Sequence, residues 1–263
     1  MIKKIWFFEI NDYTYSTPSG TEQPKVAAYP AYSETSVGFF ININQMGRVA
    51  VYVDWFNVYR QLKKNFWKKY NWLNYKELAS HFLIKDDEIV KIVYFSAYYP
   101  ESKDNSLKHK NYVRVLQYSW IMSVLWKYQQ VTRTFINKWN NLKSFILQEW
   151  DTRERFPPYK LIYKTYEEKK TDVNIAVNIL RDWLDDLYDK CFIISWDSDI
   201  TPAVESVKKR RKDKKFICIL PPWANSTAMK NVCHKTYKIK ESDLQDSQFP
   251  DIVKWIRRPE DWK

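Results

Sequence analysis

The segment CFIISWDSDITP, residues 191–202, decides how the rest of the chain is organised. Its apolar run, residues 191–194, predicts a short buried strand of the kind found in parallel sheets. Asp197 and Asp199 follow the strand with one residue between them, and Pro202 is tolerated in the first turn of a helix that begins after them. Ligands bind at the carboxyl ends of strands in open α/β sheets, so two acids there indicate a site. Because buried carboxylates without a cation are costly, we expect a divalent metal ion at this position.

The chain on either side of this segment predicts strands that alternate with helices. Continuous apolar runs indicate buried strands, and apolar residues at steps of three and four indicate helices. This alternation predicts a mainly parallel sheet with helices on both faces, an α/β fold. We expect strands over 49–53, 89–97, 159–166, 216–220 and 235–239, helices over 57–69, 75–82, 173–187 and 252–256, and a polar loop over 98–110.

Residues 113–150 carry apolar side chains at steps of three and four and are rich in Trp, which predicts a long Trp-rich helical segment of one or two helices. An exposed aromatic stripe on it would serve a homo-oligomer or a protein partner.

Composition narrows the class of partner. The formal net charge is +12, which favours a polyanion, nucleic acid first, although an AT-rich genome would shift composition in the same direction. No glycine-rich phosphate loop occurs, and the three cysteines are typical of buried thiols in a reducing compartment. No uncharged apolar run approaches the ~20 residues of a membrane span. We expect a cytoplasmic protein without membrane contact.

Three acids occupy corresponding places in the predicted sheet. Asp54 and Asp197 each follow a strand, and Asp172 opens a helix that follows one. In a right-handed βαβ sheet such positions lie on one edge and can converge. Clustered carboxylates suit Mg²⁺ or Mn²⁺. The alternative is that each acid only caps a helix.

Three motifs, VAVYVDWFNVYRQL, KKTDVNIAVNILRDW and YDKCFIISWDSDITPAVESV, together resemble the NYN-domain family of the PIN-like nuclease superfamily. The resemblance covers residues 48–237. It implies a PIN-like three-layer α/β/α sandwich and an endoribonuclease that depends on Mg²⁺ or Mn²⁺. By the same resemblance the metal ligands and catalytic residues are Asp54, Asp172, Asp197 and Asp199, supported by Asn57 and Ser195.

The chain departs from the family pattern at three positions. Asn178 stands where the family often has an acid, which removes one negative charge and weakens metal binding, although the amide can still bond a metal-bound water. Trp55 and Trp196 stand where glycine is usual. Either the two indoles stack on nucleobases, or they pack against each other or the core.

Several lysines are placed to neutralise RNA phosphates at the carboxyl edge. The basic run 208–215 falls at the opposite edge and is expected to be a solvated turn or a remote RNA contact. The better placed residues follow a strand or precede Asp172: Lys103, Lys108, Lys110, Lys164, Lys169 and Lys170.

We therefore expect an accessory segment (1–45), a nuclease domain (46–240) and a C-terminal tail with a short helix (241–263). The predicted function is hydrolysis of phosphodiester bonds in single-stranded or structured RNA. The alternative is a catalytically weak NYN domain that acts as an RNA- or protein-binding adaptor. A Toprim-like phosphotransfer site also uses an Asp-x-Asp pair, but it needs a Glu where Asp54 stands.

Overall fold

Strand β1 (Gly47–Asp54) is the central strand of the sheet. Its apolar run, residues 49–53, is fully buried, as expected for a strand covered on both faces. The computed structural model describes residues 47–98, 103–136, 160–168 and 170–263. The chain divides into two units, Met1–Ile41 and Asn42–Lys263, and every described residue belongs to the second. The expected accessory segment 1–45 therefore lies outside the described residues.

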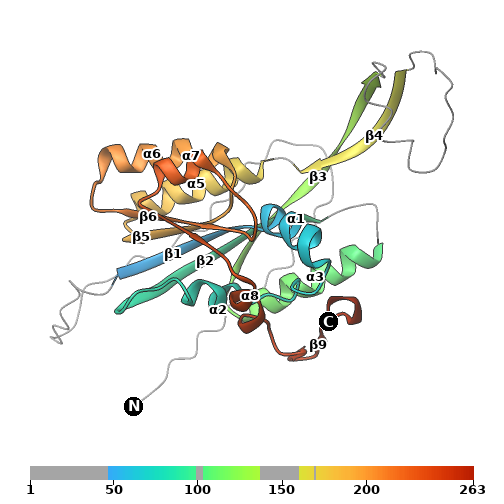
Figure 1. Cartoon of the computed structure of the whole chain (residues 1–263), viewed down its shortest axis with the longest axis horizontal. Helices are drawn as coiled ribbons and strands as arrows, with labels where there is room; N and C mark the ends of the chain where they lie inside the picture. Colours follow the sequence, from blue (N-terminus) through green and yellow to red (C-terminus); the bar gives the residue numbers. More distant parts are fainter. Residues whose placement is uncertain (1–46, 99–102, 137–159, 169) are drawn as a thin grey trace, which may run out of the picture. The chain divides into compact units, whose positions relative to one another are not determined.

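The described residues contain a seven-stranded sheet in the order β4-β3-β2-β1-β5-β6-β7 (Figure 1). All neighbouring strands are parallel except β3 and β4, which are antiparallel. The expected mainly parallel sheet is confirmed. The remaining strands are β2 (Asp87–Tyr98), β3 (Met122–Ile136), β4 (Lys160–Glu168), β5 (Lys190–Ile194), β6 (Lys215–Leu220) and β7 (Lys235–Lys238).

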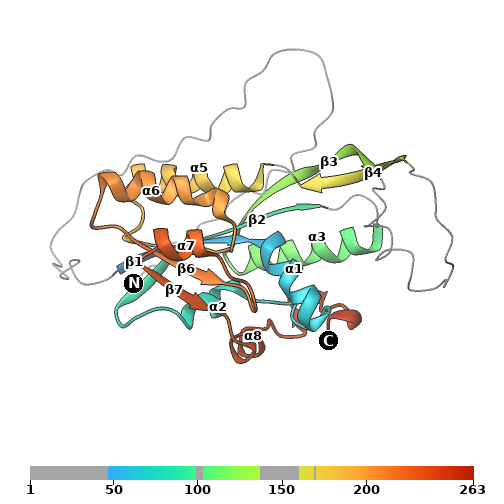
Figure 2. The same cartoon turned by 45° about the horizontal axis from the view of Figure 1, so that its top comes forward.

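Alternate side chains of β1 point into two different cores, one on each face of the sheet. Val51 and Val53 belong to one core, and Ala50 and Tyr52 to the other. Figure 2 shows helices on both sides of the sheet, so the expected three-layer α/β/α arrangement is confirmed. The first core is covered by α1 (Trp55–Phe66), α2 (Tyr75–Ser80), α3 (Lys103–Tyr118) and α8 (Glu241–Asp246), and the second by α5 (Thr171–Leu184), α6 (Thr201–Arg210) and α7 (Thr227–Val232).

The strand order reverses between β1 and β5, and this reversal positions the site. Along the chain the sheet grows from β1 through β2 to β3 on one side, whereas β5, β6 and β7 extend it on the other. The carboxyl ends of β1 and β5 lie side by side in a parallel pair. Ligands of open α/β sheets bind at such a reversal of strand order.

The predicted Trp-rich helix is wrong over most of its described length. Helix α3 ends at Tyr118, and residues 122–136 form β3; residues 137–150 lie outside the described residues. Residues 122–127 pair with β2, but residues 128–136 pair only with β4. This second part, which we call the β3–β4 ribbon, extends beyond the neighbouring strands (Figure 1). Among residues 128–134 the exposed and half-buried positions do not alternate, so the pattern that identifies a half-buried strand is missing.

Two shorter predictions are also wrong. The expected loop 98–110 contains the first half of α3. The buried apolar residues of α3 lie in the second half of the helix, so the first half shows no apolar residues at helical spacing. The expected helix 252–256 is instead a two-stranded sheet of β8 (Ile252–Val253) and β9 (Ile256–Arg257).

The last residues of the described chain pack on the first core. Trp72 donates a hydrogen bond of 2.8 Å from its indole nitrogen to the carbonyl of Pro250, and its ring contacts Phe249 and Trp262. Trp262 is only 6% exposed. In the described part of the chain, no helix is long and apolar enough to cross a membrane.

Candidate metal centre

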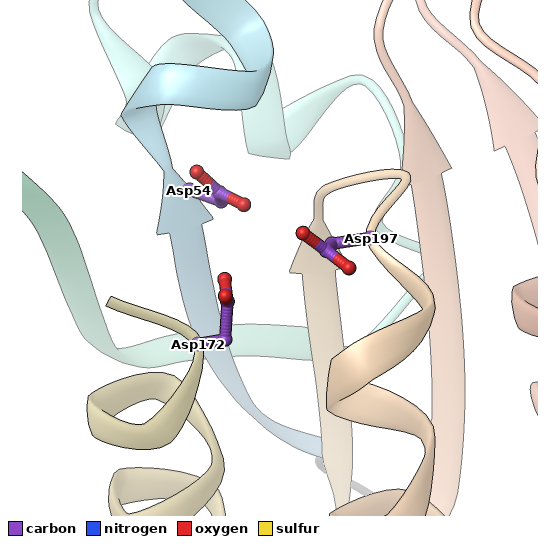
Figure 3. Close-up of side chains that lie close together, drawn as sticks. All are labelled: Asp54, Asp172 and Asp197. Carbon is purple, nitrogen blue, oxygen red and sulfur yellow. The ribbon is translucent and has the colours of Figure 1, made fainter. Parts of the chain in front are cut away.

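Three aspartates from separate segments meet at the carboxyl edge of the sheet. Asp54 ends β1, Asp172 is the second residue of α5, and Asp197 lies in the turn after β5 (Figure 3). Each offers a carboxylate oxygen, and these oxygens all lie within 4.8 Å of one another. The convergence expected from the parallel topology is therefore present. Three hard oxygen donors at this spacing fit a divalent cation such as Mg²⁺ or Mn²⁺.

The Asp54 carboxylate is held in place by hydrogen bonds from both neighbouring segments. Its side chain caps α1 by accepting from the backbone N–H of Asn57 at 3.1 Å, and the Asn57 amide also donates to Oδ2. The Ser195 hydroxyl donates to the same Oδ2 at 2.9 Å. Asp54 is 1% exposed and Ser195 is completely buried. Both residues expected to orient the acids therefore contact Asp54 directly.

Asp197 caps the short 3₁₀ helix η1 (Ser198–Ile200), with its Oδ1 accepting from the backbone N–H of Asp199 at 3.0 Å. Asp54 and Asp197 thus do cap helices, but they also belong to the carboxylate cluster, so capping is not their only role. Asp199 is exposed and is not a member of the three-carboxylate cluster. Its charge still acts on Asp172, so Asp199 adds negative potential from outside the cluster.

The cluster carries negative charge that no Lys or Arg of the described residues neutralises by an ion pair. Burial, together with the charges of Asp197 and Asp54, raises the pKa of Asp172 to about 6. Burial also raises the pKa of Asp54, although hydrogen bonds from Asn57 and Ser195 oppose that shift. Carboxyl groups repel one another in this way when a shared cation is missing, and a bound cation would reverse both effects. The residues present therefore fit a divalent metal ion.

The cluster opens into a cleft of about 720 Å³. One side of the cleft is a face of α1, where Phe56, Tyr59, Arg60 and Lys63 recur at steps of three and four. The β3–β4 ribbon lines it with Tyr128 and Arg133, and α5 adds residues next to Asp172. These residues combine positive charge with aromatic rings, the combination that binds the backbone and bases of single-stranded nucleic acid.

Sequence reasoning missed the cations of α1 and of the ribbon. Arg60 and Lys63 follow Asp54 at helical spacing, so the sequence did contain a signal that they share a face near the acid. Arg133 carried no such signal, because its strand was expected to be helix.

The two tryptophans named as candidates for base stacking both pack against a core. Trp55 is 7% exposed and lies against Tyr59, Tyr94 and Tyr112 in the first core. Trp196 is half-buried against the second core and does not line the cleft. Each indole follows the end of a buried strand, which directs it toward a core. Trp55 also lines the cleft, so its contact with a base stays a prediction.

The side chain of Asn178 makes its hydrogen bonds within its own helix, α5. Its amide donates to the carbonyl of Asn174 at 2.8 Å and accepts from Arg181 at 2.5 Å. It is not a member of the carboxylate cluster. These contacts link neighbouring turns of α5.

Of the lysines expected at the site, Lys170 lines the cleft, with its ammonium 4.5 Å from the centroid of the Trp126 ring. Lys108 instead pairs with Asp104 and Asp261, and Lys110 lies over the Tyr98 ring, because this segment is helix α3 and not a loop. Lys103 and Lys164 lie on α3 and β4 with side chains outside the described part, and Lys169 lies outside it entirely.

The family model described as "NYN domain" matches residues 48–240. No curated protein matches the sequence. A crystal structure of a protein of unknown function from Vibrio parahaemolyticus RIMD 2210633 is similar, with 15% sequence identity and a TM-score of 0.47, over 78% of this chain and 98% of that chain.

Proposed function

The chain belongs to the NYN-domain family, within the PIN-like superfamily, and from this premise we propose that it is a metal-dependent endoribonuclease. The proposed reaction adds water across a phosphodiester bond of RNA. The observation that carries the proposal is the cluster of Asp54, Asp172 and Asp197, which opens into a cleft lined with cations.

In this proposal Asp54, Asp172 and Asp197 hold one divalent cation, Mg²⁺ or Mn²⁺. Such a cation would lower the pKa of a bound water and neutralise charge on the phosphate. Asn57 and Ser195 fix the Asp54 carboxylate so that its oxygens face the cluster. Asp199 increases the negative potential that attracts the cation.

The cleft would hold RNA through its backbone. Arg60 and Lys63 of α1 and Lys170 before α5 line the cleft and can contact phosphates on either side of the scissile bond. Their charges favour association with a polyanion and agree in sign with the net charge of +12. The phosphate contacts carry no sequence information, so the proposal leaves the RNA sequence unspecified.

The test is cleavage of a fluorescent single-stranded RNA by the full chain with Mn²⁺. We expect cleavage that EDTA abolishes and that Asp197→Asn removes. Asp246→Asn is the matched control, because Asp246 is an exposed acid on α8. Cleavage that survives both EDTA and Asp197→Asn would come from a contaminant and contradict the proposal. Binding of RNA without cleavage would instead favour the adaptor function.

A further inference from the structure

Two exposed tryptophans flank the end of α1 that lies away from the metal centre. Trp67 follows the last residue of the helix and is 65% exposed. Trp223 follows the carboxyl end of β6 and is 61% exposed, and its ring lies 5.0 Å from that of Phe66, the last residue of α1. Both rings therefore lie at the same end of one helix, at the same edge of the sheet as the carboxylates.

The cleft and these rings are connected along α1. Phe56, Arg60 and Lys63 line the cleft at steps of four and three, and Trp67 is the next position at this spacing. Lys68 also lines the cleft, and its ammonium lies 5.9 Å from the centroid of the Trp67 ring. The helix of 12 residues spans about 18 Å. The cleft-lining row of α1 therefore ends next to Trp67, and Trp223 contacts the last residue of the same helix.

The charge along this surface is positive. Among the described residues Arg60, Lys63 and Lys64 have no ion pair with an acid, whereas Lys68 pairs with Asp261 at 2.5 Å and Lys69 with Glu241 at 3.4 Å. Lysines in the last turn also stabilise a helix, which accounts for Lys63 and Lys64 without a ligand. Helix stability does not account for the two exposed indoles.

The backbone gives a second reason to ask why tryptophan stands here. Trp67 has φ 58° and Trp223 has φ 57°, in a left-handed region that glycine adopts at lower cost than a bulky residue. Trp67 ends α1 with φ 58° and ψ −113°, a backbone conformation that is a genuine outlier for a bulky residue. Neither local conformation nor burial therefore favours Trp at these positions.

We propose that Trp67 and Trp223 form a base-stacking platform that binds a single-stranded nucleic acid leaving the cleft along α1. The phosphates would follow Arg60, Lys63 and Lys64, and two bases would stack on the exposed indole faces. Base–aromatic stacking is tolerant of sequence, so the platform would favour unpaired strands of sufficient length over a particular sequence. This inference rests on the proposed function, because it assumes that the cleft binds RNA.

The test uses the full chain with Asp197→Asn, in EDTA, so that binding is measured without cleavage. The probes are 5′-fluorescein oligouridylates of ~4 and ~12 nucleotides, the short and long ranges of known single-strand sites. By fluorescence anisotropy we expect Trp67→Ala and Trp223→Ala each to weaken binding of the long probe about tenfold. Binding of the short probe, which fills only the cleft, should not change.

Trp120→Ala is the matched control, because Trp120 is 81% exposed and has φ 63° but precedes β3 at the opposite edge of the sheet. Trp67→Phe and Trp223→Phe should recover most of the lost affinity, since phenylalanine keeps a stacking face. Long-probe affinity equal to that of the Trp120→Ala control would overturn the platform, and so would a loss that Phe does not recover.

The two proposals fail differently. If the unmodified chain cleaves RNA with Mn²⁺ but the tryptophan variants bind the long probe normally, the platform is wrong and the nuclease proposal stands. If the unmodified chain neither binds nor cleaves RNA, the proposed function fails and the platform fails with it.

Discussion

The hydroxyl of Ser195 donates a hydrogen bond of 2.9 Å to Oδ2 of Asp54, which joins the end of β5 to the end of β1. The same hydroxyl oxygen accepts from the backbone N–H of Asp197 at 3.0 Å. One buried side chain therefore fixes the positions of two of the three clustered carboxylates. This arrangement makes Ser195 a positioning residue for the candidate metal centre.

Replacing Ser195 with alanine should weaken binding of Mn²⁺ by ~10–100-fold, the usual effect of removing a residue that orients a metal ligand. Isothermal titration calorimetry with Mn²⁺ measures this directly. Ser198→Ala is the control, because Ser198 is exposed in η1. Equal affinities for the two variants would show that Ser195 does not position the ligands.

Binding of Mn²⁺ should fall in acid as Asp172 gains a proton. The pKa of Asp172 is raised to about 6 by burial and by Asp197 and Asp54. A metal ligand must be deprotonated, so affinity should fall about tenfold per pH unit below 6 and level off above it. Titrations between pH 5 and pH 7.5 check this, and a pH-independent affinity would contradict it.

The metal-free protein should be stabilised by Asp172→Asn at neutral pH. A carboxyl group whose pKa is higher in the folded state than its usual value of about 4 favours folding below that value. This contribution is lost as the pH rises through the folded value of about 6. The Tm of Asp172→Asn in EDTA should therefore exceed that of the unmodified chain increasingly between pH 4 and pH 6.5. A constant difference would contradict the raised pKa.

Arg60→Ala and Lys63→Ala should each reduce the salt dependence of RNA binding. A single-strand contact to one phosphate contributes about 0.7 to the slope of log affinity against log salt concentration. Affinities measured between low and moderate salt give this slope. Lys85→Ala is the control, because Lys85 is exposed in the turn before β2, at the other edge of the sheet. An unchanged slope for Arg60→Ala and Lys63→Ala would place the RNA elsewhere.

Asp182 should be essential to stability and not to catalysis. It is 3% exposed, accepts from the hydroxyl of Tyr52 at 2.8 Å and pairs with Lys91 at 2.7 Å. Asp182→Ala leaves a nearly buried ammonium without a partner, so urea denaturation should show a loss of about 3–5 kcal/mol. Asp185→Ala, at an exposed acid near the end of α5, should change stability by less than about 0.5 kcal/mol. A loss below about 1 kcal/mol for Asp182→Ala would contradict this role.

The sheet and the acid cluster were predictable because both depend on buried, regular features. The strands β1 and β5 are covered on both faces, which forces continuous apolar runs such as VAVYV into the sequence. Parallel topology then places Asp54 and Asp197 at neighbouring strand ends without any knowledge of side-chain contacts. Local rules were sufficient for this part of the molecule.

The β3–β4 ribbon was not predictable for the opposite reason. Its pairing is between β3 and β4 alone, so backbone hydrogen bonds define it and burial leaves no pattern. Lys214 shows the same limit within the basic run expected to be solvated. It is 1% exposed and donates to Asp186 and to the carbonyl of Tyr188, contacts that depend on a segment about 26 residues earlier. Neither the pairing of the ribbon nor the burial of Lys214 can be predicted from the residues next to it in the sequence.

Trp262 lines the same cleft as Asp54, although the two residues stand near opposite ends of the described chain. During translation, the cleft therefore stays incomplete until nearly all of the described chain has emerged from the ribosome.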